Sequence, residues 1–283
     1  MGDVRGIGGA TRVAGVIGWP INHSLSPTIH NAAYEALGLD WTYVPLPVAP
    51  EAVETALAGV RALGLAGLNV TMPHKEAVAA GMDRLSEDAA LLRAVNTVEV
   101  TSEGLIGHNT DAPGFARFLT GDAGFDAAGR SVLLFGAGGA ARACALALAR
   151  AGADAITVAL REPVRAAALL ATLAGSETSL DVVAFGDAAG TAPDLIVNAT
   201  PLGAHGEHLP LPPLDRSTVA VDLLYRPAIT PLQADVRASG GAAFGGLGLL
   251  LHQAALAFEL WTGRPAPMDV MSAAALAAIG ARG

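Results

Sequence analysis

A lysine surrounded by short polar residues is the first place in this sequence where chemistry is expected. The segment Asn69-Val-Thr-Met-Pro-His-Lys75 follows an apolar run at residues 65–70, which predicts a strand, and its proline suits the first turn of a helix. The ends of strands carry the chemistry of most α/β proteins. In such a place Lys75 could donate a proton or stabilise an alkoxide, and Asn69 and Thr71 could bind hydroxyl groups of a ligand. The simpler alternative is a solvated lysine in the first turn of a helix.

Two later segments also place amides and hydroxyls at the ends of predicted strands. Asn96 and Thr97 come just before one strand, and Asn109, Thr110 and Asp111 follow the next. Asn and Thr are poor residues for the interior of a strand but good donors and acceptors for a ligand with several hydroxyls. Asp111 could simply cap the helix that follows. A carboxylate and an ammonium group beside a hydroxyl-rich pocket nevertheless indicate acid–base chemistry at an alcohol or a ketone.

Two serines near the N-terminus form a further candidate binding element. Ser24 and Ser26 lie two residues apart in a loop stiffened by Pro20 and Pro27, and alternate residues of an extended segment point to the same side. Both hydroxyls could therefore face one ligand. Ser26 could instead be the N-cap of a helix that has Pro27 at its first position.

The first half of the chain alternates apolar strands with helices that end at glycines. The expected strands lie at 12–18, 41–47 and 65–70, and the expected helices at 28–37, 50–63 and 75–80. The resulting order, β-α-β-α-β-α, predicts an α/β fold with helices packed on a parallel-leaning sheet.

A dinucleotide-binding signature opens the second half of the chain. An apolar strand at 131–135 leads into Gly136-Ala-Gly138-Gly139-Ala-Ala141, a helix to Ala151 and a strand at 155–160. This is the pattern G-x-G-x-x-A in the strand–turn–helix setting of a Rossmann-type unit. The glycines let the backbone approach a pyrophosphate at the N-terminus of a helix, where free N–H groups and the helix dipole favour anions.

The tip of the second strand of this unit bears on the choice between NAD and NADP. An acidic side chain there accepts hydrogen bonds from the ribose hydroxyls, whereas an arginine pairs with a 2′-phosphate. Arg161 and Arg165 favour the phosphate, and Glu162 between them opposes it. NADP is therefore the expected cofactor, and NAD remains possible.

Later segments add two polar candidates and argue against a metal. Tyr225 follows a predicted strand and is either an aromatic at the edge of the core or a phenol that contacts a ligand. Gln253 lies on a long apolar helix, where a buried amide needs hydrogen-bond partners. His205 and His208 lack the further ligands of a metal site, so a surface loop is expected instead.

The composition narrows the class of partner and the compartment. The chain has 283 residues, with 17 basic against 26 acidic ones and a formal net charge of −9, which argues against nucleic acid or an anionic membrane as a partner. Hydrophobic residues make up 52%, yet no run has the length and flanks of a membrane span. The single cysteine, Cys144, excludes an internal disulfide. A cytoplasmic protein that acts on a small molecule is expected, with a disordered start at residues 1–12.

Together these segments resemble the shikimate dehydrogenase family, which includes shikimate and quinate dehydrogenases. The resemblance runs from about Val13 to Gly263 and is carried by a series of motifs in the family's order. They are Ser-Leu-Ser-Pro at 24–27, Asn-Val-Thr-Met-Pro-His-Lys at 69–75, Val-Asn-Thr at 95–97, Asn-Thr-Asp at 109–111, Gly-Ala-Gly-Gly-Ala at 136–140, Asn-Ala-Thr-Pro at 198–201 and Gly-Leu-Gly-Leu-Leu-Leu-His-Gln at 246–253.

This resemblance implies an NADP-dependent, reversible reduction of 3-dehydroshikimate to shikimate, a step of chorismate and aromatic amino-acid biosynthesis. It implies an α/β substrate domain at 13–111 and 247–283, to which the C-terminal helices return, and a Rossmann-type NADP domain with a doubly wound parallel sheet at 112–246. Lys75 and Asp111 would be the catalytic pair, in a monomer or a homodimer without a metal.

The resemblance also implies two sets of binding residues. The hydroxyls and the carboxylate of the substrate would be bound by Ser24, Ser26, Thr71, Asn96, Asn109, Tyr225 and Gln253. The nucleotide would contact Gly136, Ala137, Gly138, Gly139, Ala140, Arg161, Arg165, Leu223 and Gly246, with Glu87 on the nicotinamide side.

One departure from the family's pattern keeps other functions open. The strand tip reads Leu160-Arg161-Glu162, where the NADP signature of the family is commonly Asn-Arg-Thr or Asn-Arg-Ser. An NAD-dependent quinate or quinate/shikimate dehydrogenase is therefore an alternative. A second alternative is a non-catalytic protein that senses a dinucleotide or a metabolite, although such a protein would not need both Lys75 and Asp111. A folate-linked dehydrogenase of similar architecture is a distant third.

Overall fold

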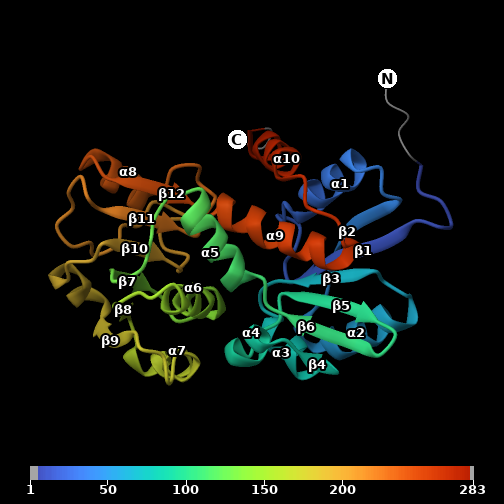
Figure 1. The fold of residues 1–283 in the computed structure, drawn as a ribbon, viewed down its shortest axis with the longest axis horizontal. Helices are drawn as coiled ribbons and strands as arrows, with labels where there is room; N and C mark the ends of the chain where they lie inside the picture. Colours follow the sequence, from blue (N-terminus) through green and yellow to red (C-terminus); the bar gives the residue numbers. More distant parts are fainter. Residues whose placement is uncertain (1–5, 281–283) are drawn as a thin grey trace. The chain divides into compact units, whose positions relative to one another are not determined.

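The structure is a computed structural model that describes residues 6–280. It divides into two compact units, of which the second, Asp111–His252, is inserted in the sequence of the first. The first unit contains the described residues up to Thr110 and those from Gln253 onward. In Figure 1 the first unit is therefore blue to teal with a red end, and the second is green to orange. The domain bounds that the sequence implied, 13–111 with 247–283 and 112–246, stay a proposal.

The first unit is built on a six-stranded sheet of mixed direction. The strand order is β2-β1-β3-β5-β6-β4, in which β1 runs parallel to both β2 and β3 while β5 is antiparallel to β3 and to β6. The strands are β1 (Arg12–Gly18), β2 (Trp41–Pro47), β3 (Gly67–Val70), β4 (Arg84–Leu85), β5 (Thr97–Thr101) and β6 (Gly104–His108). The expected parallel half is present, but a short hairpin loop joins β5 to β6 and forces an antiparallel pair.

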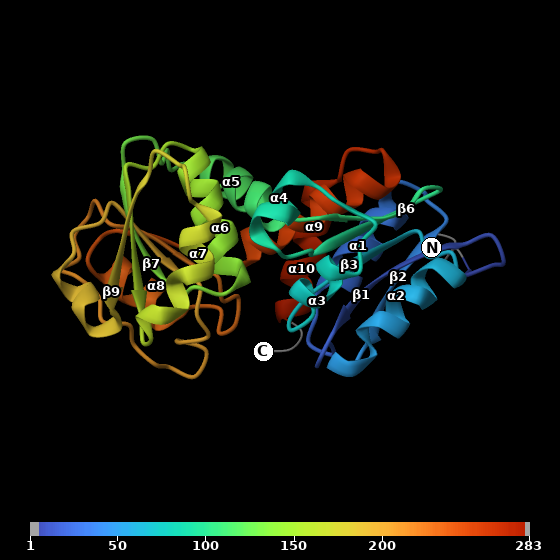
Figure 2. The same ribbon diagram turned by 90° about the horizontal axis from the view of Figure 1, so that it is seen from below.

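Helices cover both faces of this sheet. On one face, α2 (Val53–Ala62), α3 (Lys75–Ala80) and α4 (Glu87–Leu92) bury Leu57, Val78 and Ala89 against Leu68 and Leu105 of the strands. On the other face lie α1 (Ser26–Ala36), the end of α9 (Leu247–Thr262) and α10 (Met268–Gly280), and Figures 1 and 2 show α10 beside α1. Residues far apart in the sequence therefore share one core, and the C-terminal helices belong to the first unit.

Trp261 at the end of α9 fixes this second layer to the sheet. Its indole N–H donates a 3.0 Å hydrogen bond to the carbonyl oxygen of Val98 in β5. The ring lies so close over Gly67 in β3 that a β-carbon on that glycine would overlap the indole. A glycine is required at position 67 because another element approaches the strand at that point.

The second unit has a six-stranded sheet in which all strands are parallel. The order is β12-β11-β10-β7-β8-β9, so the first strand of the unit, β7, lies between the second and the fourth. This is the strand order of a Rossmann fold, and it confirms the expected fold class. The strands are β7 (Ser131–Phe135), β8 (Ala155–Leu160), β9 (Ser179–Ala184), β10 (Leu195–Asn198), β11 (Val219–Asp222) and β12 (Ala242–Gly245).

The helices of the second unit are α5 (Asp111–Gly121), α6 (Gly139–Arg150), α7 (Ala167–Thr172) and α8 (Pro231–Ala238). Short 3₁₀ turns occupy Pro163–Ala166 and Phe185–Gly190. The alanine-rich α6 is buried along most of its length and packs between α5 and α7, while α8 buries Leu232 and Val236 against the apolar side chains of β7, β10 and β11. The small side chains of α6 let it lie close to β7, which places its N-terminus at the end of that strand.

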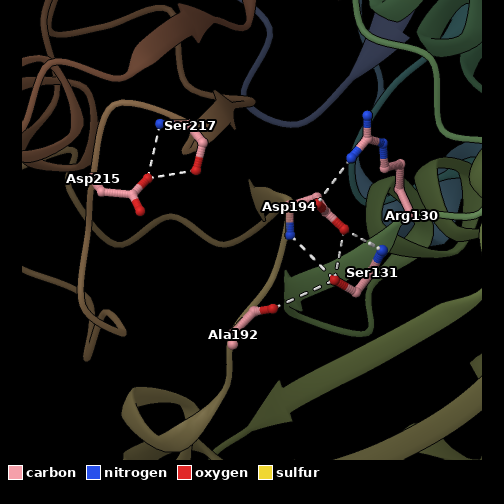
Figure 3. A network of polar contacts seen from close by, with 6 residues as sticks. All are labelled: Arg130, Ser131, Ala192, Asp194, Asp215 and Ser217. Atoms are coloured by element: carbon pink, nitrogen blue, oxygen red, sulfur yellow. Dashed lines mark hydrogen bonds and ion pairs between the residues drawn. The ribbon is translucent and has the colours of Figure 1, made fainter.

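A polar network joins the starts of β7 and β10, at the opposite end of the strands from the glycine-rich turn (Figure 3). The carboxylate of Asp194 accepts hydrogen bonds from the backbone N–H and the hydroxyl of Ser131, at 2.9 and 2.8 Å, and pairs with Arg130. These hydrogen bonds, the one from the backbone N–H first, lower the pKa of Asp194 below its ordinary value. The network fixes the register of the two central strands.

The expectation of a disordered start covers residues 1–12, of which residues 1–5 lie outside the described residues. Gly8–Thr11 form a turn, in which the N–H of Thr11 donates to the carbonyl of Gly8, and the hydroxyl of Thr11 donates to Asp40 at 2.8 Å. Arg12 then begins β1. Among the described residues, no helix is both long and apolar enough to span a membrane.

Candidate active site

Three polar loops belong to the first unit up to its boundary at Thr110: residues 69–75, residues 94–97 and the segment that follows β6. Backbone hydrogen bonds join them. The N–H of Val95 donates to the carbonyl of Lys75 at 2.9 Å, which ties the first residue of α3 to the segment before β5. The N–H of Val70 donates to the carbonyl of Asn96 at 2.8 Å, and the N–H of Asn96 donates to His108 at 3.0 Å. The backbones of Lys75, Asn96 and the end of β6 are therefore held together at one end of the strands.

The side chain of Asn96 links these loops to Thr110, in the segment after β6. Its Oδ1 accepts from the backbone N–H of Thr110 at 2.8 Å, and its Nδ2 donates to the hydroxyl of Thr110 at 3.0 Å. Nδ2 also lies 3.5 Å from Oε1 of Gln253 on α9. Both Asn96 and Gln253 are predicted to bind the substrate, and the structure places them next to each other in the first unit. Thr110 immediately precedes Asp111, the first residue of α5.

The side chain of Asn69 makes its hydrogen bonds to other residues of the fold, which does not support the expectation that it binds ligand hydroxyls. Its Oδ1 accepts from the hydroxyl of Tyr43 at 2.7 Å, and its Nδ2 donates to the carbonyl of Asn96 at 3.1 Å and to Thr97 at 3.0 Å. The side chain is buried, so these partners satisfy an amide that would otherwise destabilise the core. Asn69 therefore supports the loop that carries Lys75.

A hydrogen bond joins Ser24, in the loop before α1, to Ser26, the first residue of that helix. The hydroxyl oxygen of Ser24 accepts a hydrogen bond from the backbone N–H of Ser26 at 3.2 Å. Ser26 is buried and is the first residue of α1, so it is not the N-cap; that position belongs to Leu25, which makes no side-chain cap. Thr71 packs its methyl group against Gly18, and its backbone N–H donates to Ile17 at 2.9 Å.

His74 is a positioning residue that the sequence did not single out. Its ring is buried, with Nε2 2.7 Å from the carbonyl oxygen of Val48, and it sits immediately before Lys75. This contact anchors the N-terminus of α3. Asn109 is likewise buried and donates from Nδ2 to the carbonyl of Ala94 at 2.9 Å. Glu87 is exposed in the first turn of α4.

The second unit contains a pocket of about 490 Å³ where the glycine-rich turn ends β7. Its other walls come from the segments that follow β8 and β10, the neighbours of β7 on either side. A Rossmann fold binds its ligand in the crevice between β7 and β10, where the strand order reverses. The lining residues are Gly136, Ala137, Gly138, Ala159, Leu160, Arg161, Glu162, Arg165, Phe185, Ala199, Thr200, Pro201 and Leu202.

The glycines of this turn serve two different purposes. Gly136 has a φ of +108°, and a β-carbon there would lie 3.0 Å from the carbonyl oxygen of Ala199, so the fold itself requires glycine. Apart from the adjoining residues of the chain, no atom of the described residues lies within 4 Å of a β-carbon built on Gly138 or Gly139. At these two positions glycine keeps open space in front of α6, whose N-terminus has no side-chain cap. An uncapped helix start behind open space fits the pyrophosphate of a dinucleotide.

Two family models match this chain. Residues 16–98 match the shikimate dehydrogenase substrate binding domain, and residues 246–276 match the shikimate 5′-dehydrogenase C-terminal domain. A shikimate dehydrogenase (NADP(+)) of Citrifermentans bemidjiense is 44% identical over 95% of this chain and 96% of its own length. The enzyme of the same name from Rubrobacter xylanophilus is 48% identical over 92% of this chain and 94% of its own. The chain belongs to the shikimate dehydrogenase family.

A solved structure agrees with this membership. The shikimate 5-dehydrogenase of Thermus thermophilus, in complex with NADP(H) and shikimate, superposes with a TM-score of 0.85 at 39% identity, over 95% of this chain and all of that chain. The membership confirms the family that the motifs indicated and makes this chain an NADP-dependent oxidoreductase of the shikimate dehydrogenase family.

At the tip of β8, Arg165, which the resemblance assigns to the nucleotide, forms an ion pair with Glu162. Both carboxylate oxygens of Glu162 are engaged by Arg165, with Nη2 3.0 Å from Oε1 and Nε 3.1 Å from Oε2. The guanidinium of Arg161 lies 5.7 Å from the centre of the Phe185 ring. The three charged side chains are all exposed at the pocket.

A buried carboxylate supports the segment that contains Leu223 and Tyr225. Oδ1 of Asp222 accepts from Nδ2 of Asn198 at 3.1 Å and from the N–H of Leu224 at 3.0 Å, and Oδ2 accepts from Thr230 at 2.7 Å. Burial raises the pKa of Asp222 despite these hydrogen bonds. The next residues are held just as closely, because a β-carbon on Gly246 would overlap the carbonyl of Leu223.

The two histidines of the loop after β10 each face a carboxylate. Nδ1 of His205 lies 3.7 Å from Glu207, and Nδ1 of His208 lies 3.0 Å from Asp235. Throughout residues 6–280, no group of three or more His, Cys, Asp or Glu side chains is placed to hold a metal ion.

Proposed function

We propose that this chain catalyses the reversible, NADP-dependent reduction of 3-dehydroshikimate to shikimate, in the biosynthesis of chorismate and aromatic amino acids. The observation that carries the proposal is the set of hydrogen bonds that joins the backbone of Lys75 to the segments of Asn96 and Thr110, so that a lysine, an amide and a hydroxyl belong to one rigid part of the unit. A polyhydroxylated ketone needs this combination for recognition and for proton transfer. The glycine-rich pocket of the second unit supplies a matching place for the dinucleotide.

In this proposal Lys75 gives a proton to the alkoxide that forms when the ring ketone is reduced, and takes it back in the reverse direction. Asp111 orients Lys75 and accepts a hydrogen bond from the neighbouring substrate hydroxyl. General acid catalysis of this kind contributes about 10²–10⁴-fold. One feature of the composition supports the role: among the 17 lysines and arginines, Lys75 is the only lysine. An arginine there could hold an anion but could not release a proton near neutral pH.

The remaining family residues bind the two ligands. Ser24, Ser26, Thr71, Asn96, Asn109, Tyr225 and Gln253 are proposed for the hydroxyls and the carboxylate of the substrate. NADPH, when bound, supplies the hydride. The backbone from Gly136 to Ala140 holds its pyrophosphate, Arg161 binds its 2′-phosphate with Arg165 beside it in the same pocket, and Leu223, Gly246 and Glu87 lie at its nicotinamide. We also propose that the protein is cytoplasmic and acts as a monomer or a homodimer.

The test is the initial rate of absorbance change at 340 nm with shikimate or quinate, each with NADP⁺ and with NAD⁺. We expect the highest kcat/KM for shikimate with NADP⁺. Faster turnover of quinate with NAD⁺ would place the chain with the quinate dehydrogenases, and no turnover of any pair would favour a sensor.

Two variants of Lys75 make this assay specific to the proposed mechanism. Lys75→Ala is expected to lower kcat by about 10²–10⁴-fold while the affinity for NADP⁺ stays unchanged. Lys75→Arg keeps the positive charge and is expected to recover little of that loss, because a guanidinium holds its proton. Full activity of Lys75→Arg would show that only charge is needed at this position.

A further inference from the structure

One of the two positive charges that line the nucleotide pocket is offset by a negative charge. The lining contains two arginines, Arg161 and Arg165, and one carboxylate, Glu162, and its remaining members are uncharged. A 2′-phosphate carries close to two negative charges. Two arginines would match it, but with Glu162 present the lining offers a net charge of a single cation.

The local backbone builds the pair between Glu162 and Arg165. Glu162 is the residue before the 3₁₀ turn Pro163–Ala166, and the N–H of Arg165 donates to the carbonyl of Glu162 at 3.0 Å. In such a turn the side chains of residues three apart lie on the same side. The guanidinium of Arg165 then meets both oxygens of the carboxylate, at 3.0 and 3.1 Å, in the two-pronged geometry that arginine favours.

We propose that Glu162 is the residue that sets the cofactor selectivity of this chain. The inference rests on the proposed function only in taking this pocket as the dinucleotide site. Glu162 holds Arg165 away from the 2′-phosphate and repels that phosphate, so NADP binds mainly through Arg161. When the cofactor is NAD, the carboxylate of Glu162 accepts hydrogen bonds from the free ribose hydroxyls. Glu162 thus weakens the preference for NADP and lets the chain use NAD as well.

The exposure of the pair sets the size of the effect. The side chains of Glu162 and Arg165 are 58% and 71% exposed, and ion pairs this exposed are weak and screened by salt. Freeing Arg165 by neutralising Glu162 therefore gives a modest gain in phosphate binding rather than a large one. We expect the selectivity to shift by about 10-fold when Glu162 is neutralised, and the shift to shrink as the salt concentration rises.

The experiment measures the binding of two nucleotide fragments, 2′,5′-ADP and 5′-AMP, by titration calorimetry to the full chain. Glu162→Gln is expected to bind 2′,5′-ADP about 5-fold more tightly and 5′-AMP about 2-fold less tightly than the unaltered chain. Arg165→Gln alone is expected to change the affinity for 2′,5′-ADP by less than about 2-fold, and in the double variant it is expected to remove the gain of Glu162→Gln. Arg161→Gln is the matched control and is expected to weaken 2′,5′-ADP by about 10-fold or more.

Two results would overturn the inference. One is equal affinity of Glu162→Gln and the unaltered chain for both fragments. The other is a large loss of 2′,5′-ADP binding in Arg165→Gln alone, which would mean that Arg165 already holds the phosphate. Binding of fragments needs no turnover, so a chain that follows the expected pattern yet oxidises no shikimate would refute the proposed function and leave the role of Glu162 in place.

Discussion

Oδ1 of Asn96 accepts a 2.8 Å hydrogen bond from the backbone N–H of Thr110. This contact connects two of the three polar loops of the first unit, and the third is connected through the backbone of Asn96 itself. Because Thr110 immediately precedes Asp111, this hydrogen bond from Thr110 to Asn96 also helps to hold the backbone of Asp111 in place. Asn96 is therefore expected to matter for catalysis as well as for binding.

Asn96→Ala should lower kcat by roughly 10²-fold, because even a small displacement of catalytic groups is costly. It should also destabilise the fold by about 1–3 kcal/mol, since buried groups lose their partners. Asn31→Ala is the matched control: Asn31 in α1 makes two hydrogen bonds to the backbone of Tyr43 in β2, at 2.8 and 2.9 Å, so neither end of this contact belongs to the three loops. It should lose stability with little change in kcat. Steady-state kinetics and urea unfolding of both variants check this, and equal losses of kcat would assign Asn96 a purely structural role.

Two glycines of the nucleotide turn should respond to alanine in opposite ways. Gly138→Ala adds a methyl group that meets none of the described residues beyond its own chain neighbours, so the midpoint of thermal unfolding should stay unchanged or rise slightly. The affinity for NADP⁺ should fall by about 10-fold or more, because the methyl group fills the space before α6. Gly136→Ala should lower the thermal midpoint, because alanine is strained at a φ of +108°. Calorimetric binding and thermal melts separate the two, and normal NADP⁺ affinity in Gly138→Ala would contradict the assignment of this turn.

His30 should make the fold sensitive to acid. Its ring is fully buried, stacks on Tyr43 at 4.3 Å, and has no hydrogen-bond partner for either nitrogen among the described residues. Burial lowers the pKa of His30 from 6.5 to about 3. The unfolded chain therefore takes up a proton below pH 6.5 that the folded chain refuses, and stability falls as the pH drops from 6.5 towards 3.

His30→Phe removes this proton uptake and keeps an aromatic ring in place. Between pH 7 and pH 4.5 the unaltered chain should lose roughly 2–3 kcal/mol more stability than the variant. Urea unfolding at both values measures the difference. An identical loss in the two proteins would show that His30 does not titrate in this range.

Asp222 should tolerate loss of its charge but not loss of its oxygens. Asp222→Ala leaves Asn198, Leu224 and Thr230 without their acceptor and should cost about 2–4 kcal/mol. Asp222→Asn keeps the shape and should cost less than about 1 kcal/mol near neutral pH. Because burial raises the pKa of Asp222, the native carboxyl gains stability relative to the asparagine variant as the pH falls through that raised pKa. Urea midpoints over a pH series should show the native chain's lead over the asparagine variant widening as the pH falls, and parallel curves would contradict this.

Local pattern was enough to predict much of this structure. The loop before Lys75 and the turn at Gly136 could be predicted because apolar runs, glycines and prolines mark strand ends and helix starts over a few residues. The helices at Glu87–Leu92 and Ala167–Thr172 were not predicted, since each is only a short helix with a weak pattern. The antiparallel pairing of β5 with β3 was also missed, because nothing in one strand states the direction of its neighbour.

The sequence was enough to predict which residues lie in the candidate site, but not which partners each of them bonds. Asn69 and Asn96 look alike in the sequence, yet Asn69 is committed to Tyr43 and Thr97 while Asn96 reaches Thr110 and Gln253. The pairing of Glu162 with Arg165 depends on the 3₁₀ turn Pro163–Ala166, which was not predicted from the sequence. Such partners are set by tertiary contacts over long separations, which residue types alone do not fix.

The route of the chain also has a consequence for how the protein is made. The second unit is one uninterrupted stretch, so it can complete its core while the ribosome is still translating. The first unit cannot, because Trp261 must reach Gly67 and Val98, and α10 must reach α1, after the intervening stretch has been synthesised. One apolar face of the sheet formed by β1 to β6 therefore stays uncovered until α9 and α10 have been synthesised. Nascent chains truncated before Trp261 should accordingly be recognised by chaperones and proteases.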